Sequence, residues 1–108
     1  MSKRVEDCAH ILNTICHTKG KTRRELLKIL DNKTIKAICD CSLNIVRGTL
    51  KITPEEKEKL RKHEKSLLKL IDKRIPIKQK KELIQQKGGG FLLPLLAPVL
   101  ASVLANVL

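Results

Sequence analysis

The stretch "KTIKAICDCSLNIVRG" at residues 33–48 places apolar or small side chains at steps of three and four positions. This spacing aligns them along one face of an α-helix, whereas a half-buried strand would alternate every second residue. We therefore expect a helix over residues 33–47 that ends at Gly48, with Asp31 and Asn32 as its start signal. Its predicted buried stripe consists of Ile35, Ile38, Cys39, Ser42, Leu43 and Val46.

The chain before this stretch predicts two more helices. Residues 4–18 carry an apolar face of Val5, Cys8, Ile11, Leu12, Ile15 and Cys16. We expect Gly20 to end this helix in a left-handed conformation. Thr22 and Glu25 form a predicted capping box for a shorter helix over residues 22–30. Its predicted buried side chains are Leu26, Leu27, Ile29 and Leu30.

The chain after residue 48 contains the clearest helix start. Thr53 is a predicted N-cap, Pro54 stands at the first helical position and Glu56 completes a capping box. The helix is expected to run to about residue 72 with Leu60, Leu67, Leu68 and Ile71 as its apolar stripe. A last short helix follows over residues 77–86, with Leu83 and Ile84 inside.

No segment shows strand alternation, so the predicted fold class is all-α. We expect a small bundle of four to five short helices in a basic domain over residues 1–87. A glycine joint follows at residues 88–90, and residues 91–108 form a hydrophobic C-terminal tail that is predicted to be helical.

The charge of the chain predicts its partners. The 23 Lys and Arg residues outnumber 11 Asp and Glu residues, which gives a net charge of +12 and favours polyanions or anionic lipid surfaces. Phe91 is the single aromatic residue, so we expect phosphate contacts with double-stranded DNA, largely independent of sequence, rather than base stacking. The candidate nucleic-acid-binding residues are Lys57, Lys59, Arg61, Lys62, Lys65, Lys69, Lys73, Arg74, Lys78, Lys80, Lys81 and Lys87. Lesser candidates are Arg23, Arg24, Lys28, Lys33, Lys36 and Arg47.

Cysteine spacing favours buried thiols over a metal site. Cys8, Cys16, Cys39 and Cys41 lack paired Cys-x2-Cys spacing, and three of them lie within apolar stripes. Residues 1–16 lack the apolar run of a signal peptide, so we expect a reducing compartment and free thiols. No nucleotide loop, nucleophile elbow or carboxylate pair is present, and we expect no cofactor, no metal and no enzyme activity.

The tail and its joint leave several functions open. A helix of 18 residues would measure about 27 Å, close to the hydrocarbon thickness of a bilayer. The tail therefore predicts docking to a membrane or to capsid proteins, and it favours self-association. The joint of Gly88, Gly89 and Gly90 is either a flexible linker or a cleavage site. The candidate docking residues are Phe91, Leu92, Leu93, Pro94, Leu95, Leu96 and Pro98.

The stretch "KGGGFLLPLLAP" at residues 87–98 is similar to the joint in the adenovirus core protein X precursor, where a basic DNA-condensing segment meets Gly-Gly and then Leu-Pro-Leu-Leu-x-Pro. The whole chain resembles small proteins with this ending that are encoded by Polinton/Maverick elements and adintoviruses. Shared features include "RRELLKIL" at residues 23–30, "ICDCSLNIVRGTLKIT" at residues 38–53 and the segment from residue 59 to residue 100.

This resemblance implies a core or minor capsid protein of a virion that is also found in the nucleus of the host cell. It implies that a viral cysteine protease cleaves the joint after Gly-Gly. Gln86 or Lys87 would then stand four positions before the cut, where that protease type favours an aliphatic residue or methionine. Two alternatives stay open beside the DNA-binding function. One is a tail-anchored or membrane-active protein whose basic body lies on anionic lipid, and the other is a capsid cement protein.

Overall fold

The computed structural model describes residues 3–48, residues 53–85, and the single positions Ala101 and Leu104. Within these residues the chain forms helices and no strand, which confirms the all-α class. The helices are α1 (Lys3–Asp7), α2 (Ala9–His17), α3 (Gly20–Lys28), α4 (Asn32–Val46), α5 (Pro54–Arg61), α6 (Glu64–Ile71) and α7 (Ile77–Gln85).

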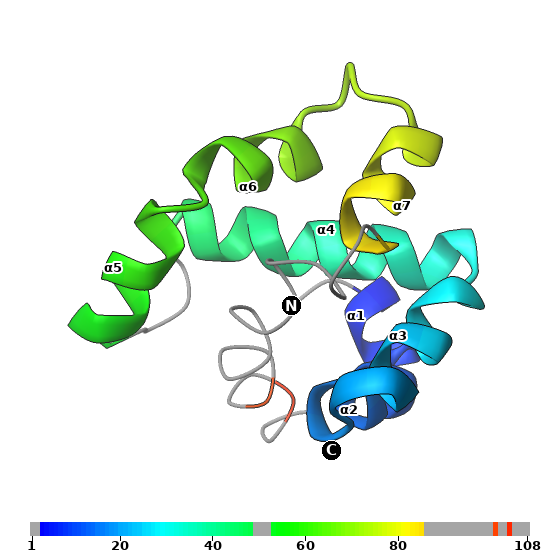
Figure 1. Ribbon diagram of the computed structural model, residues 1–108. Helices are drawn as coiled ribbons and strands as arrows, with labels where there is room; N and C mark the ends of the chain where they lie inside the picture. The colour runs from blue at the N-terminus through cyan, green and yellow to red at the C-terminus, as the bar shows by residue number, and fades with distance from the viewer. Residues whose placement is uncertain (1–2, 49–52, 86–100, 102–103, 105–108) are drawn as a thin grey trace.

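Helix α4 is the centre of the molecule. It runs across the middle of Figure 1, with α6 and α7 along one side and α1, α2 and α3 gathered near its N-terminal end. Ile35, Ala37, Ile38 and Cys41 are fully buried although they lie on different faces of this helix. A helix that is buried on most of its faces must be surrounded by other elements, so the remaining helices pack around α4.

The start of α4 confirms the predicted signal. The Asp31 carboxylate accepts a hydrogen bond from the Thr34 backbone N–H at 2.8 Å, which satisfies one of the N–H groups left unpaired in the first turn. This bond holds the pKa of the Asp31 carboxyl below its usual range. The predicted helix over residues 33–47 is thus confirmed to within one residue at each end.

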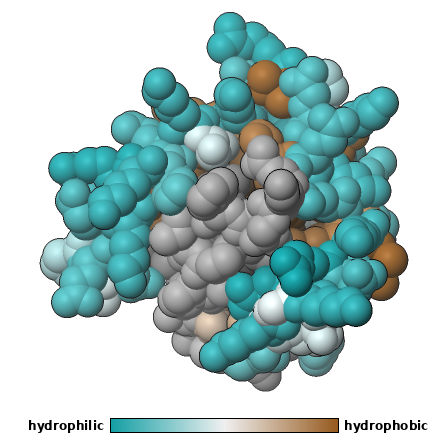
Figure 2. All heavy atoms as spheres, in the orientation of Figure 1, coloured by the Kyte–Doolittle hydropathy of each residue, from teal (hydrophilic) through white to brown (hydrophobic). Residues whose placement is uncertain are grey.

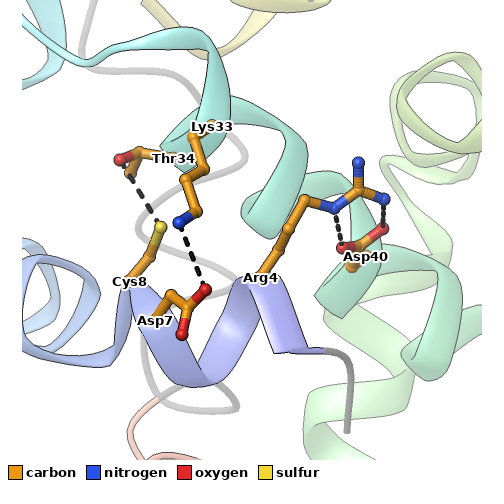
Figure 3. A network of polar contacts seen from close by, with 6 residues as sticks. All are labelled: Arg4, Asp7, Cys8, Lys33, Thr34 and Asp40. Carbon is orange, nitrogen blue, oxygen red and sulfur yellow. Dashed lines mark hydrogen bonds and ion pairs between the residues drawn. The ribbon is translucent and has the colours of Figure 1, made fainter.

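Three polar contacts fasten α1 to α4 (Figure 3). The Arg4 guanidinium forms two hydrogen bonds to the Asp40 carboxylate, at 2.9 and 3.0 Å. The Lys33 ammonium lies 3.1 Å from an Asp7 carboxylate oxygen. The buried Thr34 hydroxyl lies 3.9 Å from the Cys8 sulfur. These contacts fix α1 along α4 over about two turns, since Lys33 and Asp40 are seven positions apart in the same helix.

The prediction of one helix over residues 4–18 was wrong. The chain forms α1 and α2 with a break at Cys8, whose φ of −100° and ψ of 7° lie outside the helical range. The hydrogen bonds across the break are kept, because Cys8 N–H donates to Arg4 and Leu12 N–H donates to the Cys8 carbonyl. Helical spacing therefore continues through the break, which is why the sequence pattern did not reveal it.

The predicted start of the next helix was also wrong. Helix α3 begins at Gly20, so Thr22 is a helical residue and not a cap. Gly20 does have a left-handed φ of +59°, as predicted, but it lies at the start of α3. The end of α2 is closed instead by Arg23, which donates hydrogen bonds of 3.2 Å to the carbonyls of Ile15 and Cys16.

The capping box of α5 is confirmed. The Thr53 hydroxyl accepts from Glu56 N–H, and the Glu56 carboxylate accepts from Thr53 N–H, both at 3.1 Å. The prediction of one helix from residue 54 to residue 72 was wrong, because the chain breaks at Lys62 and His63 between α5 and α6. The break allows Leu67 and Leu70 of α6 to reach the core beside α4.

Three predicted core residues are exposed instead. Ile29 is 77% exposed at the end of α3, and Val46 and Leu68 are each 45% exposed. In α4, Ile45 is buried in place of Val46, and in α6 Leu70 is buried in place of Leu68. Most of the two predicted stripes is buried as expected, including Ile35, Ile38 and Leu67, and the difference is confined to positions such as Val46 and Leu68, which lie at the surface.

The core also receives a residue from the predicted tail. Leu104 is fully buried and belongs to the same hydrophobic cluster as Leu12, Ile38, Leu70 and Ile84. Ala101, one turn earlier, is half-buried, and both residues have helical backbone conformation. Nothing in the amino-acid pattern distinguished Leu104 from the other aliphatic residues of the tail.

Candidate nucleic-acid interface

The predicted nucleic-acid-binding residues are accessible. Of the eleven that the structure describes, nine are exposed, and Lys80 and Lys81 are half-buried. Lys87 lies outside the described residues. Figure 2 shows hydrophilic side chains over most of the surface formed by α5, α6 and α7, interrupted by small hydrophobic patches. These elements therefore present their cations to solvent, as phosphate contacts require.

Few of these cations are neutralised by neighbouring carboxylates. Within residues 53–85, the ion pairs join Arg61 to Glu58 at 3.8 Å and Arg74 to Asp72 at 3.0 Å. The Arg61 pair is exposed on both sides, and such pairs contribute at most about 1 kcal/mol. The hydrogen bonds that Arg74 donates hold the pKa of the Asp72 carboxyl below its usual range. Most lysines of this surface are thus available to an external anion.

The cations do not form one continuous face. On α6, Lys65 and Lys69 are exposed one turn apart, while Leu67 and Leu70 between and after them are buried. Lys57 and Arg61 of α5 line a different depression, which they share with the exposed residues Val46 and Leu68. The predicted stripe is therefore divided among several surfaces, because the breaks after α5 and α6 redirect the chain.

One of these surfaces is a hollow of about 320 Å³ between α1, α4, α6 and α7. Two of the predicted nucleic-acid-binding residues, Lys73 and Lys80, line this hollow, and so does Lys36 of α4. Arg4 joins them, although the sequence analysis had not identified it as a candidate, since the contact spans 36 positions and leaves no local pattern. The hollow is also lined by Cys39, Asp40, Leu43, Leu70, Ile71, Ile75 and Ile77.

Three of the six lesser candidates, Arg23, Lys28 and Lys33, form contacts within the protein. Arg23 closes the end of α2, Lys33 binds Asp7, and Lys28 lies 3.4 Å from the Glu25 carboxylate. Arg24 and Arg47 are exposed. Some of these cations are thus engaged in hydrogen bonds or ion pairs within the protein, whereas others are exposed to solvent.

The four cysteines are free thiols, as predicted, and Cys8, Cys39 and Cys41 are buried. Burial raises the pKa of the Cys41 thiol to about 12 and that of the Cys39 thiol to about 11. The charges of Lys80 and Arg4 oppose this rise in the pKa of Cys39, and all three residues line the same hollow. These thiols are protonated at neutral pH and are poor nucleophiles.

The residues that the structure describes contain neither a cluster of metal ligands nor a membrane-spanning helix. Among them, no group of three or more His, Cys, Asp or Glu side chains is placed to hold a metal ion. No helix within the described ranges is long and apolar enough to cross a membrane. The candidate cleavage residues at 88–90 and the candidate docking residues between positions 91 and 98 lie outside the described residues.

Comparison with known proteins gives no relative. No family model, no curated protein and no solved structure matches this chain.

Proposed function

We propose that this protein binds double-stranded DNA through phosphate contacts and helps to condense it as a non-enzymatic core protein of a virus or virus-derived element. The observation that carries the proposal is the accessibility of the lysines on α5, α6 and α7, of which few are paired with a carboxylate. Cations that displace counterions from a duplex reduce repulsion between neighbouring duplexes. The virion and the host nucleus are the corresponding locations.

The absence of aromatic residues from residues 1–90 favours this mode of binding. Single-strand and RNA modules stack bases on aromatic side chains, and this body offers none. Lysines instead contact phosphates as point charges, and such contacts carry no information about base sequence. Binding is therefore expected to be insensitive to sequence and strongly dependent on salt.

The other proposed partners depend on the apolar tail. Docking to capsid proteins, attachment to an anionic membrane and removal by a viral cysteine protease all require residues 88–108 to be accessible. The burial of Leu104 in the core means that at least this part of the tail must leave the body before it can dock elsewhere. The burial of Leu104 therefore does not favour a membrane-active protein or a capsid cement protein over a DNA-binding protein.

The test compares two double variants of the full-length chain. Lys65→Gln with Lys69→Gln removes two exposed cations from α6, and Lys19→Gln with Lys21→Gln removes two exposed cations near the start of α3. Duplex affinity, measured by fluorescence anisotropy with unrelated sequences, should fall roughly tenfold or more in the α6 variant, because each charge-assisted hydrogen bond contributes about 1.5–3 kcal/mol. The control should lose clearly less.

Equal losses in the two variants would show that only net charge matters and would overturn the assignment to this surface. Absence of duplex binding by the unmodified chain would overturn the proposed function itself.

A further inference from the structure

The hollow between α1, α4, α6 and α7 brings together like charges that are distant in the sequence. Arg4, Lys36, Lys73 and Lys80 come from α1, α4, the turn after α6 and α7, and they surround the same 320 Å³. Gathering four cations costs free energy through their mutual repulsion. Such an arrangement needs a compensating anion, and the fold supplies one carboxylate within the lining, that of Asp40.

Asp40 neutralises only part of this charge. Its two oxygens accept hydrogen bonds from Arg4, in the two-point geometry that satisfies a guanidinium best. Asp72, next to Lys73 in the chain, is bound by the side chain and the backbone N–H of Arg74. The Asp72 carboxylate also interacts electrostatically with Lys80. Lys36 and Lys73, together with a partly compensated Lys80, therefore leave an excess of positive charge around the hollow.

The floor of the hollow is aliphatic. Leu70 is fully buried there, Cys39 is 9% exposed, and Leu43, Ile71, Ile75 and Ile77 are half-buried. Walls of low polarity weaken the screening by water and strengthen the field of the surrounding cations. The N-terminal end of α7 and the C-terminal end of α6 both line the hollow, through Ile77 and Ile71, so the fields of these two helix ends oppose each other and the lysines supply the positive charge.

The lysines and the apolar lining of the hollow indicate the class of ligand that would fit it. Three lysines match a dianion better than a singly charged carboxylate, and a phosphate monoester carries about 1.5 to 2 negative charges at neutral pH. Among the residues that the structure describes, the lining has no aromatic side chain on which a ring could stack, so an aliphatic group suits the rest of the ligand better. The volume stands at the lower end of the range for small-molecule sites, which is about 300–1,000 Å³.

We infer that this hollow is a binding site for a phosphate monoester carried by an aliphatic group, such as the headgroup and first carbons of a phosphatidic acid. Lys36, Lys73 and Lys80 bind the phosphate, and Leu43, Ile71 and Ile75 contact the aliphatic part. Lys73 and Lys80 also belong to the proposed DNA surface, but the inference does not rest on DNA binding, because Arg4 of α1, Lys36 of α4 and the apolar lining define the site.

The experiment uses full-length protein labelled with nitrogen-15 and a short-chain, water-soluble phosphatidic acid, with inorganic phosphate as a second probe. Saturable amide shifts are expected near the hollow, in residues 36–43 and 70–80, with the lipid phosphate binding more tightly than inorganic phosphate. Lys73→Gln with Lys80→Gln should weaken lipid binding at least about tenfold. Lys57→Gln with Lys59→Gln, which makes the same charge change on α5, should alter it by less than about twofold.

Each arm has an outcome that overturns part of the inference. Shifts that do not saturate, or equal weakening in the two variants, would show diffuse attraction to a basic protein and no site. Equal affinity for both probes would mean that a free phosphate is the ligand and would overturn the aliphatic part. Circular dichroism should show the same helix content in both variants, since Lys57, Lys59 and Lys73 are exposed and Lys80 is only half-buried.

Discussion

One residue of the C-terminal tail, Leu104, packs in the hydrophobic core of the helical domain. Leu104 is fully buried in the same cluster as residues from α2, α4, α6 and α7. Composition indicated a tail separate from the helical domain, because residues 91–108 lack ionisable side chains. An apolar residue can however be buried in the chain's own core as well as in a foreign partner, and no local pattern distinguishes these cases.

Leu104→Ala should therefore destabilise the whole protein. Removing a buried Leu side chain costs about 2–5 kcal/mol, depending on how far the surrounding residues relax into the space. Urea unfolding followed by circular dichroism measures the change. Ile29→Ala is the matched control, because Ile29 is 77% exposed and its truncation should cost no more than about 0.5 kcal/mol. Similar losses for the two variants would contradict the burial of Leu104.

The buried thiols predict how stability changes with pH. The pKa of Cys41 is raised from 9.0 to about 12 and that of Cys39 to about 11, chiefly by burial. In the unfolded chain these thiols lose their protons near pH 9, so above that pH the unfolded state binds fewer protons than the folded state. Stability due to these groups is complete below pH 9 and is lost as the pH rises toward 11–12.

Chemical unfolding of Cys41→Ala at pH 8, 9 and 10 checks this expectation. The variant should be less stable at pH 8, since it leaves a small gap in the core, but its stability should fall less steeply with pH than that of the unmodified chain. A slope as steep as that of the parent protein would show that other groups, such as lysines, account for the loss.

Among the elements, helices were predicted well and their breaks were not. The periodic pattern located all the helical regions, and the Thr53–Glu56 capping box marked the start of α5 correctly because its signals are local. The breaks at Cys8 and at Lys62–His63 contain neither glycine nor proline. They depend on how neighbouring helices pack on α4, which a single segment does not encode.

The residues of the candidate site were also predicted only in part. The sequence identified Lys73 and Lys80 from a run of charge, and both reach the hollow. It did not identify Arg4, since the pairing with Asp40 joins residues 36 positions apart. It also treated Arg23 as a candidate for binding, whereas this side chain closes the end of α2 through two backbone carbonyls.

The capping box gives a prediction at the scale of one helix. Thr53→Ala removes the hydroxyl that accepts from Glu56 N–H and should cost about 1 kcal/mol of stability. Thr53→Ser keeps the acceptor and should stay within a few tenths of the parent value. Thermal unfolding of the two variants measures the difference, and an equally large loss in the serine variant would point to the methyl group instead of the cap.

At the scale of the whole molecule, a buried α4 packs against two groups of helices whose charged side chains differ in their surroundings. Contacts of α1 with α4 are fixed by ion pairs and a buried hydroxyl, so several charges near α4 serve the fold (Figure 3). The charges on α5, α6 and α7 are mostly exposed and few are paired. This difference is the physical basis for assigning the phosphate contacts to the second group.

The most direct test of the proposed function is the affinity of the full-length chain for unrelated DNA duplexes across a series of salt concentrations. If at least five phosphates are neutralised, the logarithm of the binding constant should fall with the logarithm of salt concentration at a slope of about −4.5 or steeper, and Lys65→Gln with Lys69→Gln should reduce this slope by about 2. A slope near zero, or a slope unchanged in that variant, would contradict DNA binding through the lysines of α6.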